Sequence, residues 1–307
     1  MKGIILSAIF LSAMFMVSGC SQGQIRNADG ENDKIRIITT IYPLYEFAKE
    51  VAGDKAEVSL LVPAGSEPHD FEPKPSDIVR ISNADIFLYT GDAMEPWVSD
   101  VLDGVNNKNL IVIYASKYSV VIPANPDSDE EGSYNPHIWL DFENDEKIVS
   151  AFAAVLSAMY PKNQDYFIGN ADGYKQKLRN LDDGYISGLK NCRTRKFITN
   201  HDAFEYLGKR YNLEPIPIYG LSADNEPSPR EIKQILDIAK ENNLRFVYYE
   251  SFVSPKISET IAKEIGAGVL ILNPVESMTQ QEIEEGETFI SAMEKNLENL
   301  KIGLECE

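Results

Sequence analysis

The chain has 307 residues, 43% of them hydrophobic and 25% charged, so it is long enough for two globular domains and does not have the composition of a disordered protein. Lys and Arg total 29 against 48 Asp and Glu, which gives a formal net charge of −19 at pH 7. So acidic a chain is repelled by nucleic acids and by anionic lipid surfaces, and it attracts cations. The composition therefore argues against nucleic acid as a partner.

The first 20 residues predict a lipoprotein signal peptide. Lys2 provides a positive start, an apolar stretch follows that is short for a bilayer span, and Val17-Ser18-Gly19-Cys20 has the pattern of a bacterial lipobox. We expect cleavage before Cys20 and lipidation of its sulfur; an ordinary secretory signal with an incidental cysteine is the alternative. Residues 21–33 are polar and predict a flexible tether. The mature protein should be extracytoplasmic, and the lipid should be its only membrane anchor, on the outer face of the cytoplasmic membrane.

From residue 34 onward, short β-rich runs alternate with helical periodicity, which predicts an α/β fold of mostly parallel sheets flanked by helices. The expected strands are residues 35–39, 58–62, 85–89, 110–114, 196–199, 215–219, 246–249 and 269–272. Helices are expected from apolar spacings of three and four, and they begin near residues 44, 76, 148, 167, 204, 228 and 289. Ser228-Pro229-Arg230-Glu231 is the strongest helix start, with Ser as N-cap, Pro at N1 and Glu at N3.

One helical pattern is long enough to join two lobes. Its apolar residues are Phe167, Tyr174, Leu178, Leu181, Tyr185 and Leu189, and they extend over about seven turns of 3.6 residues. Such a helix is too long for a crossover within one compact sheet and should act as a rigid strut. The sequence therefore predicts an N-terminal lobe at residues 34–160, a linking helix at 161–191 and a C-terminal lobe at 192–307.

Three histidines, His69, His137 and His201, are the only ones in the chain, and each follows a predicted strand or the loop that leaves it. Ligands of open α/β sheets lie beyond the carboxyl ends of strands, so one site between the lobes can include all three. Imidazole nitrogen suits zinc better than magnesium or calcium, and it makes manganese less favourable. We expect a zinc site of three imidazoles, one of which Asp141 orients.

The same three histidines with an open coordination position also fit a catalytic zinc that activates water. Glu250 or Glu72 would then be the general base. A hydrolase also needs a substrate pocket and oxyanion donors, and the sequence shows no sign of either. We therefore expect that the protein is not an enzyme. The alternatives are a zinc-dependent hydrolase and a surface adhesin.

Five motifs occur in an order and spacing that match a known family. They are Tyr42-Pro43-Leu44, His69-Asp70-Phe71-Glu72-Pro73-Lys74-Pro75-Ser76-Asp77, Asn135-Pro136-His137-Ile138-Trp139-Leu140-Asp141, His201-Asp202-Ala203-Phe204 and Glu226-Pro227-Ser228-Pro229. The chain resembles the substrate-binding lipoproteins of zinc/manganese ABC importers, also called metal-binding adhesin-like lipoproteins, over residues 34–304. The resemblance implies two α/β lobes joined by a long helix, with a divalent transition metal held in the cleft between them. It also implies a monomer that delivers the metal to an ABC permease and its ATPase. A histidine at position 201 is typical of zinc-type members, so Zn²⁺ is expected over Mn²⁺.

The chain departs from that family at two places. The loop before His137 is short and acidic, at residues 125–132, where zinc-type members often have a long His-rich loop. The family's carboxylate ligand near the end of the last strand falls on Asn273, so the amide of Asn273, or a water that it holds, is the candidate fourth ligand. In that case Glu72 or Glu250 should supply negative charge nearby. The alternative is that Asn273 only caps the turn before Pro274.

Two cysteines remain after Cys20. Cys192 ends the linking helix and Cys306 ends the final helix, so a disulfide between them would staple the second lobe. Export permits oxidation, and two free thiols are the alternative.

Overall fold

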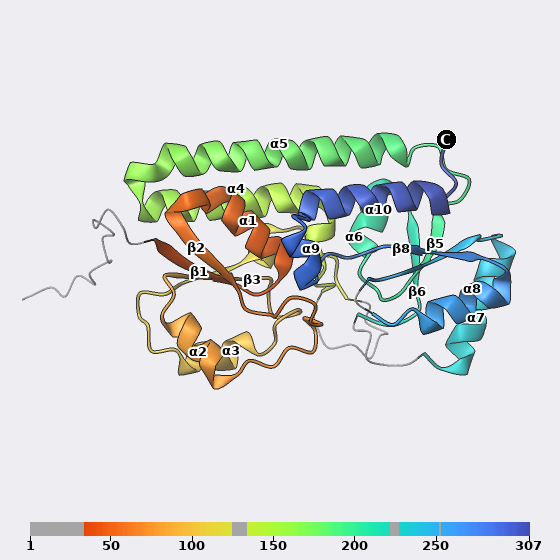
Figure 1. Cartoon of the computed structure of the whole chain (residues 1–307), viewed down its shortest axis with the longest axis horizontal. Coiled ribbons are helices and arrows are strands. Elements are labelled where there is room, and N and C mark those ends of the chain that lie inside the picture. The colour runs from red at the N-terminus through yellow and green to blue at the C-terminus, as the bar shows by residue number, and fades with distance from the viewer. Residues whose placement is uncertain (1–33, 125–133, 222–226, 252) are drawn as a thin grey trace, which may run out of the picture.

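A computed structural model of the chain describes residues 34–124, 134–221, 227–251 and 253–307 (Figure 1). The signal peptide, the tether, Cys20 and the acidic loop therefore lie outside the described residues. The structure contains two four-stranded parallel sheets with the same topology. The first has the order β2-β1-β3-β4 and the second the order β6-β5-β7-β8. The strands are β1 (Ile35–Thr39), β2 (Ala56–Leu60), β3 (Ile86–Tyr89), β4 (Ile111–Tyr114), β5 (Lys196–Thr199), β6 (Glu214–Pro217), β7 (Phe246–Tyr249) and β8 (Gly268–Ile271).

Helices cover both faces of each sheet. They are α1 (Tyr42–Ala52), α2 (Pro75–Ser82), α3 (Val98–Gly104), α4 (Phe142–Met159), α5 (Gln164–Gly188), α6 (Glu205–Tyr211), α7 (Pro229–Glu241), α8 (Lys256–Ile265), α9 (Gln280–Glu284) and α10 (Phe289–Gly303). Four 3₁₀ turns are η1 (Gly53–Lys55), η2 (Ala115–Tyr118), η3 (Ile138–Leu140) and η4 (Pro161–Asn163). The α/β fold with two lobes, which the sequence predicted, is confirmed.

The alternation of side chains along each strand explains the layers. In β1, Ile37 belongs to the core under α1, α4 and α5, whereas the next residue, Ile38, belongs to the core under α2 and α3. In β5, Phe197 belongs to the core under α6 and α10, and the next residue, Ile198, belongs to the core under α7 and α8. A period of two with both faces apolar is what a parallel strand buried on both sides requires.

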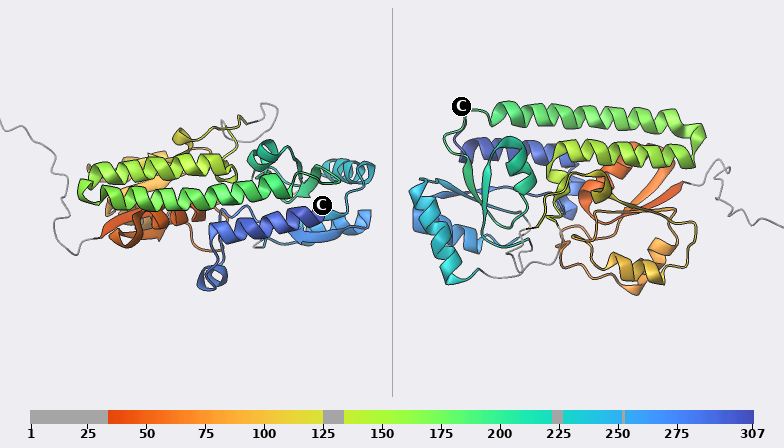
Figure 2. Two further views of the ribbon diagram at one scale, coloured as in Figure 1. Left: turned by 90° about the horizontal axis from the view of Figure 1, so that it is seen from above. Right: turned by 180° about the vertical axis from the view of Figure 1, so that it is seen from behind.

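The long helix α5 lies along both lobes (Figures 1 and 2). It packs on α1 and α4 of the N-terminal lobe and on α10 of the C-terminal lobe, and its buried face includes Phe167, Tyr174 and Tyr185. At 25 residues it is about 37 Å long at 1.5 Å per residue. Within the link expected at 161–191, the structure has the short turn η4 and then α5, which ends at Gly188.

The core is continuous between the lobes. The ring of Phe289, the first residue of α10, lies 5.4 Å from that of Phe47 in α1 and 6.5 Å from that of Phe142 in α4, edge to face in both cases. Aromatic pairs of this geometry stabilise the fold beyond the apolar area that they bury. The two lobes therefore share packed side chains in addition to the helix that connects them.

Local predictions held where side-chain chemistry fixes an element's end. Ser228 Oγ accepts a hydrogen bond from the backbone N of Glu231 at 3.3 Å, and the Glu231 carboxylate accepts one from the backbone N of Ser228 at 2.7 Å, so the predicted capping box is present. The helices α3, α8 and α9 were not predicted.

Cys192 and Cys306 form a disulfide, so the alternative of two free thiols does not fit the structure. No helix in the described ranges is both long enough and apolar enough to cross a membrane.

Candidate metal centre

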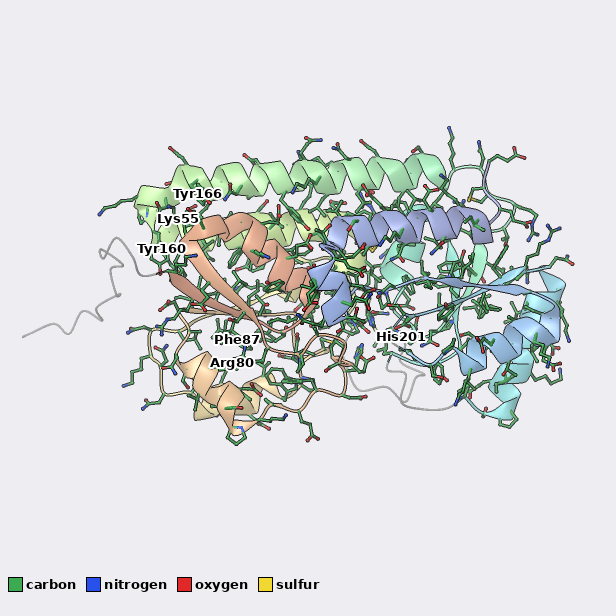
Figure 3. All side chains as sticks on the ribbon, in the orientation of Figure 1. Lys55, Arg80, Phe87, Tyr160, Tyr166 and His201 are labelled. Carbon is green, nitrogen blue, oxygen red and sulfur yellow. A yellow bond between two sulfur atoms is a disulfide. The ribbon has the colours of Figure 1, made fainter. Side chains whose placement is uncertain are left out.

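The structure brings the three histidines together from three separate loops. His69 lies between β2 and α2, His137 directly precedes η3, and His201 is the second residue after β5. The Nε2 atom of His137 is 3.2 Å from that of His69 and 3.1 Å from that of His201. His137 and His201 are buried, with 0% and 1% exposure, and the His69 side chain is 9% exposed. Figure 3 places His201 where the two lobes meet.

Glu276 is the fourth member of the cluster. Its Oε2 lies 3.3 Å from His137 Nε2, 3.7 Å from His69 Nε2 and 3.8 Å from His201 Nε2. Glu276 is fully buried, and neither carboxylate oxygen accepts a conventional hydrogen bond from the described residues. One ligand atom from each of these four side chains lies within 4.8 Å of the others. In a tetrahedral zinc site with bonds of about 2.1 Å, the ligand atoms are about 3.4 Å apart, close to these spacings.

Hydrogen bonds fix the tautomers of two of the imidazoles. Nδ1 of His137 is 2.8 Å from Asn135 Oδ1, and Nδ1 of His201 is 2.5 Å from Glu250 Oε1. The amide of Asn135 cannot be reversed, because its Nδ2 already donates to the carbonyl of Asp202. Both Nδ1 atoms must therefore carry the proton, which leaves the Nε2 lone pairs directed at each other and at a carboxylate. Such a cluster requires a cation, either a proton or a metal ion, at its centre.

The expected role of Asn273 is corrected by this geometry. Its Oδ1 accepts from the backbone N of Val275 at 2.9 Å, and its Nδ2 donates to Ser251 Oγ at 3.1 Å, so both ends of the amide stabilise the turn after β8. The acidic group that faces the imidazoles is Glu276, three residues later. One signal in the sequence was available, because Glu276 is the first carboxylate after the last strand.

Two further expectations for the surroundings of the site need correction. Asp141 orients no imidazole; it caps the N-terminus of α4 by accepting from Glu143 N, and it pairs with Arg210 at 3.0 Å. Asn135 has the role expected of Asp141. Of the two candidate acids, Glu250 does contact His201, whereas Glu72 is exposed and outside the cluster.

The charges of the cluster are strongly coupled. Burial lowers the pKa of His137 to about 3. Burial also acts to lower the pKa of His201, but Glu250 and Glu276 outweigh it and raise that pKa to about 10. For Glu276, burial acts to raise the pKa, and His201, His137 and His69 together hold it well below its usual range. At neutral pH His201 therefore carries a proton, which a metal ion would have to displace in order to bind its Nε2.

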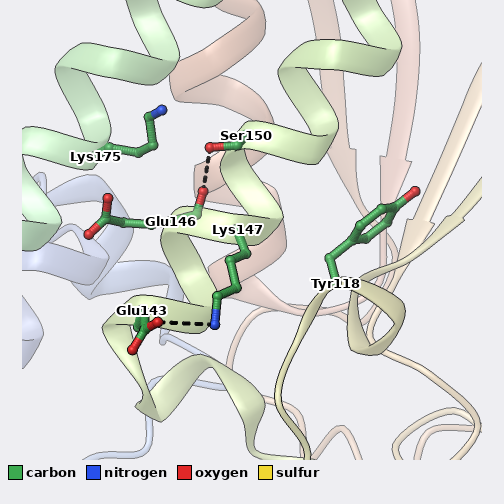
Figure 4. Close-up of a pocket in the computed structure, with 6 residues that line it drawn as sticks. All are labelled: Tyr118, Glu143, Glu146, Lys147, Ser150 and Lys175. Atoms are coloured by element: carbon green, nitrogen blue, oxygen red, sulfur yellow. Dashed lines mark hydrogen bonds and ion pairs between the residues drawn. The ribbon is translucent and has the colours of Figure 1, made fainter.

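A separate surface cavity of about 550 Å³ lies between α4, α5 and η2 (Figure 4). Its charged groups are already paired, since Lys147 lies 3.3 Å from Glu143, Glu146 pairs with Arg179, and Lys175 pairs with Asp172. It shares no residue with the histidine cluster.

Comparisons with known proteins find relatives that are described as zinc-uptake and zinc-binding proteins. A family model described as zinc-uptake complex component A, periplasmic (ZnuA) matches residues 37–303. The zinc-binding lipoprotein AdcA of Streptococcus pneumoniae (strain ATCC BAA-255 / R6) is 39% identical over 310 residues, which cover 98% of this chain and 61% of AdcA. The high-affinity zinc uptake system protein ZnuA of Bacillus subtilis (strain 168) is 36% identical, with 98% of this chain and 96% of that protein covered.

Solved structures show the same likeness. The Zn(II)-bound ZnuA-like domain of S. pneumoniae AdcA superposes with a TM-score of 0.78 at 39% identity, covering 89% of this chain and 99% of that domain. The laminin-binding protein Lmb of Streptococcus agalactiae, described as a bifunctional protein with adhesin and metal transporting activity, gives 0.79 at 33% identity, covering 89% and 100%. The chain spans 61% of the length of S. pneumoniae AdcA. The sequence match and the structural match agree over nearly the whole chain, which therefore belongs to the ZnuA family of zinc-uptake complex components.

Proposed function

We propose that the protein is an extracytoplasmic zinc receptor. It binds one Zn²⁺ with His69, His137, His201 and Glu276, and it delivers the ion to the permease of an ABC transporter and its ATPase. The observation that carries the proposal is the convergence of imidazole lone pairs and a buried carboxylate without a hydrogen bond on one point between the lobes.

The ligand set favours zinc over manganese. Three nitrogens and one oxygen at tetrahedral spacing match the preferred coordination of Zn²⁺. Mn²⁺ prefers more ligands and harder, oxygen-rich ones. The names of AdcA and ZnuA, which describe zinc binding and zinc uptake, support the same choice.

The hydrolase alternative is disfavoured by the same ligand set. A catalytic zinc keeps one position for water or substrate, whereas four protein ligands fill a tetrahedral ion. Glu250, a candidate general base, is already engaged by Nδ1 of His201. Glu72, the other candidate, is exposed and outside the cluster.

The location and state of the chain belong to the proposal as well. Residues 1–20 contain the signal peptide, which is cleaved before Cys20, so that Cys20 becomes the first residue of the mature protein and carries the lipid. Residues 21–33 are the tether, and the mature protein is a monomer. The lobes span 34–160 and 192–307, with 161–191 as the link. Cys20→Ala should abolish incorporation of a labelled fatty acid into the protein, which autoradiography after electrophoresis detects; label that persists in the variant would contradict the lipid anchor.

The binding proposal is tested with purified, metal-stripped protein. A competing chromophoric chelator gives the zinc affinity, and native mass spectrometry gives the stoichiometry. The parent should bind one zinc ion, and His69→Ala, His137→Ala, His201→Ala and Glu276→Gln should each bind it more weakly by orders of magnitude. Unchanged affinity in two of these variants would refute the ligand set. Growth of a deletion strain in zinc-depleted medium, with and without the parent protein, tests delivery to the transporter.

A further inference from the structure

Glu46 is a buried carboxylate at the junction of the lobes, outside the metal cluster. It lies in α1, is 6% exposed, and is bonded by three donors from three elements. Tyr174 of α5 donates to Oε1 at 2.8 Å, while Tyr42 Oη and the backbone N of Phe289 donate to Oε2 at 3.1 and 2.5 Å. A buried carboxylate is tolerated only when its oxygens are satisfied in this way. Glu46 thus ties the first residue of α10 to the N-terminal lobe and to the linking helix.

The segment from Glu276 to Phe289 is attached to the N-terminal lobe, although it follows the last strand of the C-terminal lobe. The carbonyl of Glu276 accepts from the backbone N of Tyr42 at 3.1 Å, and the carbonyl of Met278 accepts from the backbone N of Gly65 at 2.9 Å. Tyr42 Oη also lies 3.1 Å from the carbonyl of Glu287. Figure 1 shows α9 and the start of α10 beside α1.

A turn in an uncommon conformation separates this segment from β8. Val275 has a φ of 63°, in the left-handed region that β-branched residues avoid. The turn is held by Asn273 Oδ1, which accepts from Val275 N, and by Trp139, whose Nε1 donates to the carbonyl of Pro274 at 2.7 Å. A backbone in this state persists only when its surroundings determine it. The direction of Glu276 therefore depends on anchors both before and after the turn, and Tyr42 with Glu46 is the anchor after it.

We propose that Glu46 is a positioning residue for Glu276, which it holds at the metal site by fastening the segment 276–289 to α1. The proposal rests on the proposed role of Glu276 as a zinc ligand. Glu276 is then mechanically part of the N-terminal lobe, together with His69, whereas His201 belongs to the C-terminal lobe. Any separation of the lobes would divide the ligand set between these two groups.

The test compares two variants, each of which removes a buried carboxylate that accepts hydrogen bonds from three donors. Glu46→Leu releases the segment 276–289. The control is Glu95→Leu, because Glu95 is 2% exposed and accepts from Thr40 Oγ1, Thr90 N and Gly91 N, none of which belongs to that segment. Zinc affinity is measured by chelator competition. Glu46→Leu should weaken zinc binding by about 10- to 100-fold, as outer partners of metal ligands do. Glu95→Leu should leave the affinity at the parent value.

A double-mutant cycle shows whether Glu46 acts through Glu276. In the Glu276→Gln background, Glu46→Leu should cause no further loss of zinc affinity. The absorption spectrum of the Co²⁺-loaded Glu46→Leu protein should resemble that of Co²⁺-loaded Glu276→Gln, because both retain three imidazoles and lack the carboxylate. A loss caused only by a weakened fold would appear equally in both backgrounds.

The possible outcomes separate the two proposals. Parent-like zinc affinity in Glu46→Leu, or an equal loss of affinity in both backgrounds, overturns the positioning role of Glu46. Glu276 remains a ligand in that case if Glu276→Gln binds zinc more weakly than the parent. Parent-like affinity in Glu276→Gln overturns both. If Glu46→Leu does not fold, Tyr42→Phe takes its place, because it removes the hydroxyl shared by Glu46 and the carbonyl of Glu287. It should give a smaller loss that is also absent in the Glu276→Gln background, and a parent-like affinity overturns the positioning role.

Discussion

At the scale of single residues, two of the histidines that face the cluster centre are each held by a hydrogen bond from Nδ1 to a second residue. Asn135 holds His137, and Glu250 holds His201. Each partner accepts the Nδ1 proton and so turns the Nε2 lone pair toward the centre. His69 is the most exposed of the three histidines, and it lies on a loop whose Gly65 bonds the segment after Glu276.

The pH dependence of zinc binding follows from His201. Its pKa of about 10 means that the imidazolium is the dominant form below that pH, and zinc binds only the unprotonated ring. The zinc association constant should therefore rise about tenfold per pH unit between pH 7 and 9. The pKa of His69 is also raised, because Glu276 outweighs the effect of burial, so the slope should steepen once the pH falls through the pKa of His69. Calorimetric or chelator-competition titrations across this range measure the slope, and a flat profile above pH 7 would contradict the coupling.

Glu250→Gln tests the partner of His201. The amide can still accept from Nδ1, but it lacks the charge that raises the His201 pKa. Zinc affinity should fall by about 10-fold or more at high pH, as for other outer partners of metal ligands, and its dependence on pH should flatten. Glu72→Gln is the matched control, since Glu72 is exposed and outside the cluster. Equal behaviour of the two variants would exclude a role for Glu250.

At the scale of elements, sequence patterns predicted what local chemistry determines. β1, β5 and β7 have the predicted bounds, and the capping box at Ser228 is present, because apolar runs and caps act over a few residues. Glu276 was missed because its position depends on the left-handed Val275 and on bonds to α1, more than 200 residues earlier in the chain. Asp141 was assigned wrongly because its carboxylate is also the N-cap of α4, and the acceptor for His137 is the amide of Asn135, two residues before it.

The disulfide between Cys192 and Cys306 closes the C-terminal lobe. It links positions 114 residues apart, so it restricts a long loop in the unfolded chain. Replacing both cysteines with serine should lower the free energy of unfolding by on the order of 4 kcal/mol. Zinc affinity should not change, since no cluster residue belongs to the bridged ends. Urea unfolding with and without the disulfide measures the effect, and equal midpoints and slopes would rule out a stabilising bridge.

At the scale of the whole molecule, the two lobes are held by α5, by a shared aromatic core and by the bonds of Glu46. A single helix of about seven turns resists bending, unlike a hinge of two or three strands. Small-angle scattering of the zinc-free and zinc-loaded protein should therefore give nearly equal radii of gyration. Clear compaction on addition of zinc would show that the lobes close over the ion and that the strut is not rigid.

The central claim is that one zinc ion is held by three imidazoles and one carboxylate between the lobes. Diffraction data collected at the zinc absorption edge from crystals of the zinc-loaded protein test it most directly. We predict one anomalous peak, about 2.0 to 2.2 Å from Nε2 of His69, His137 and His201 and from a carboxylate oxygen of Glu276. A peak bonded to Asn273 in place of Glu276, a peak with fewer than three imidazoles, or no peak between the lobes would contradict the account.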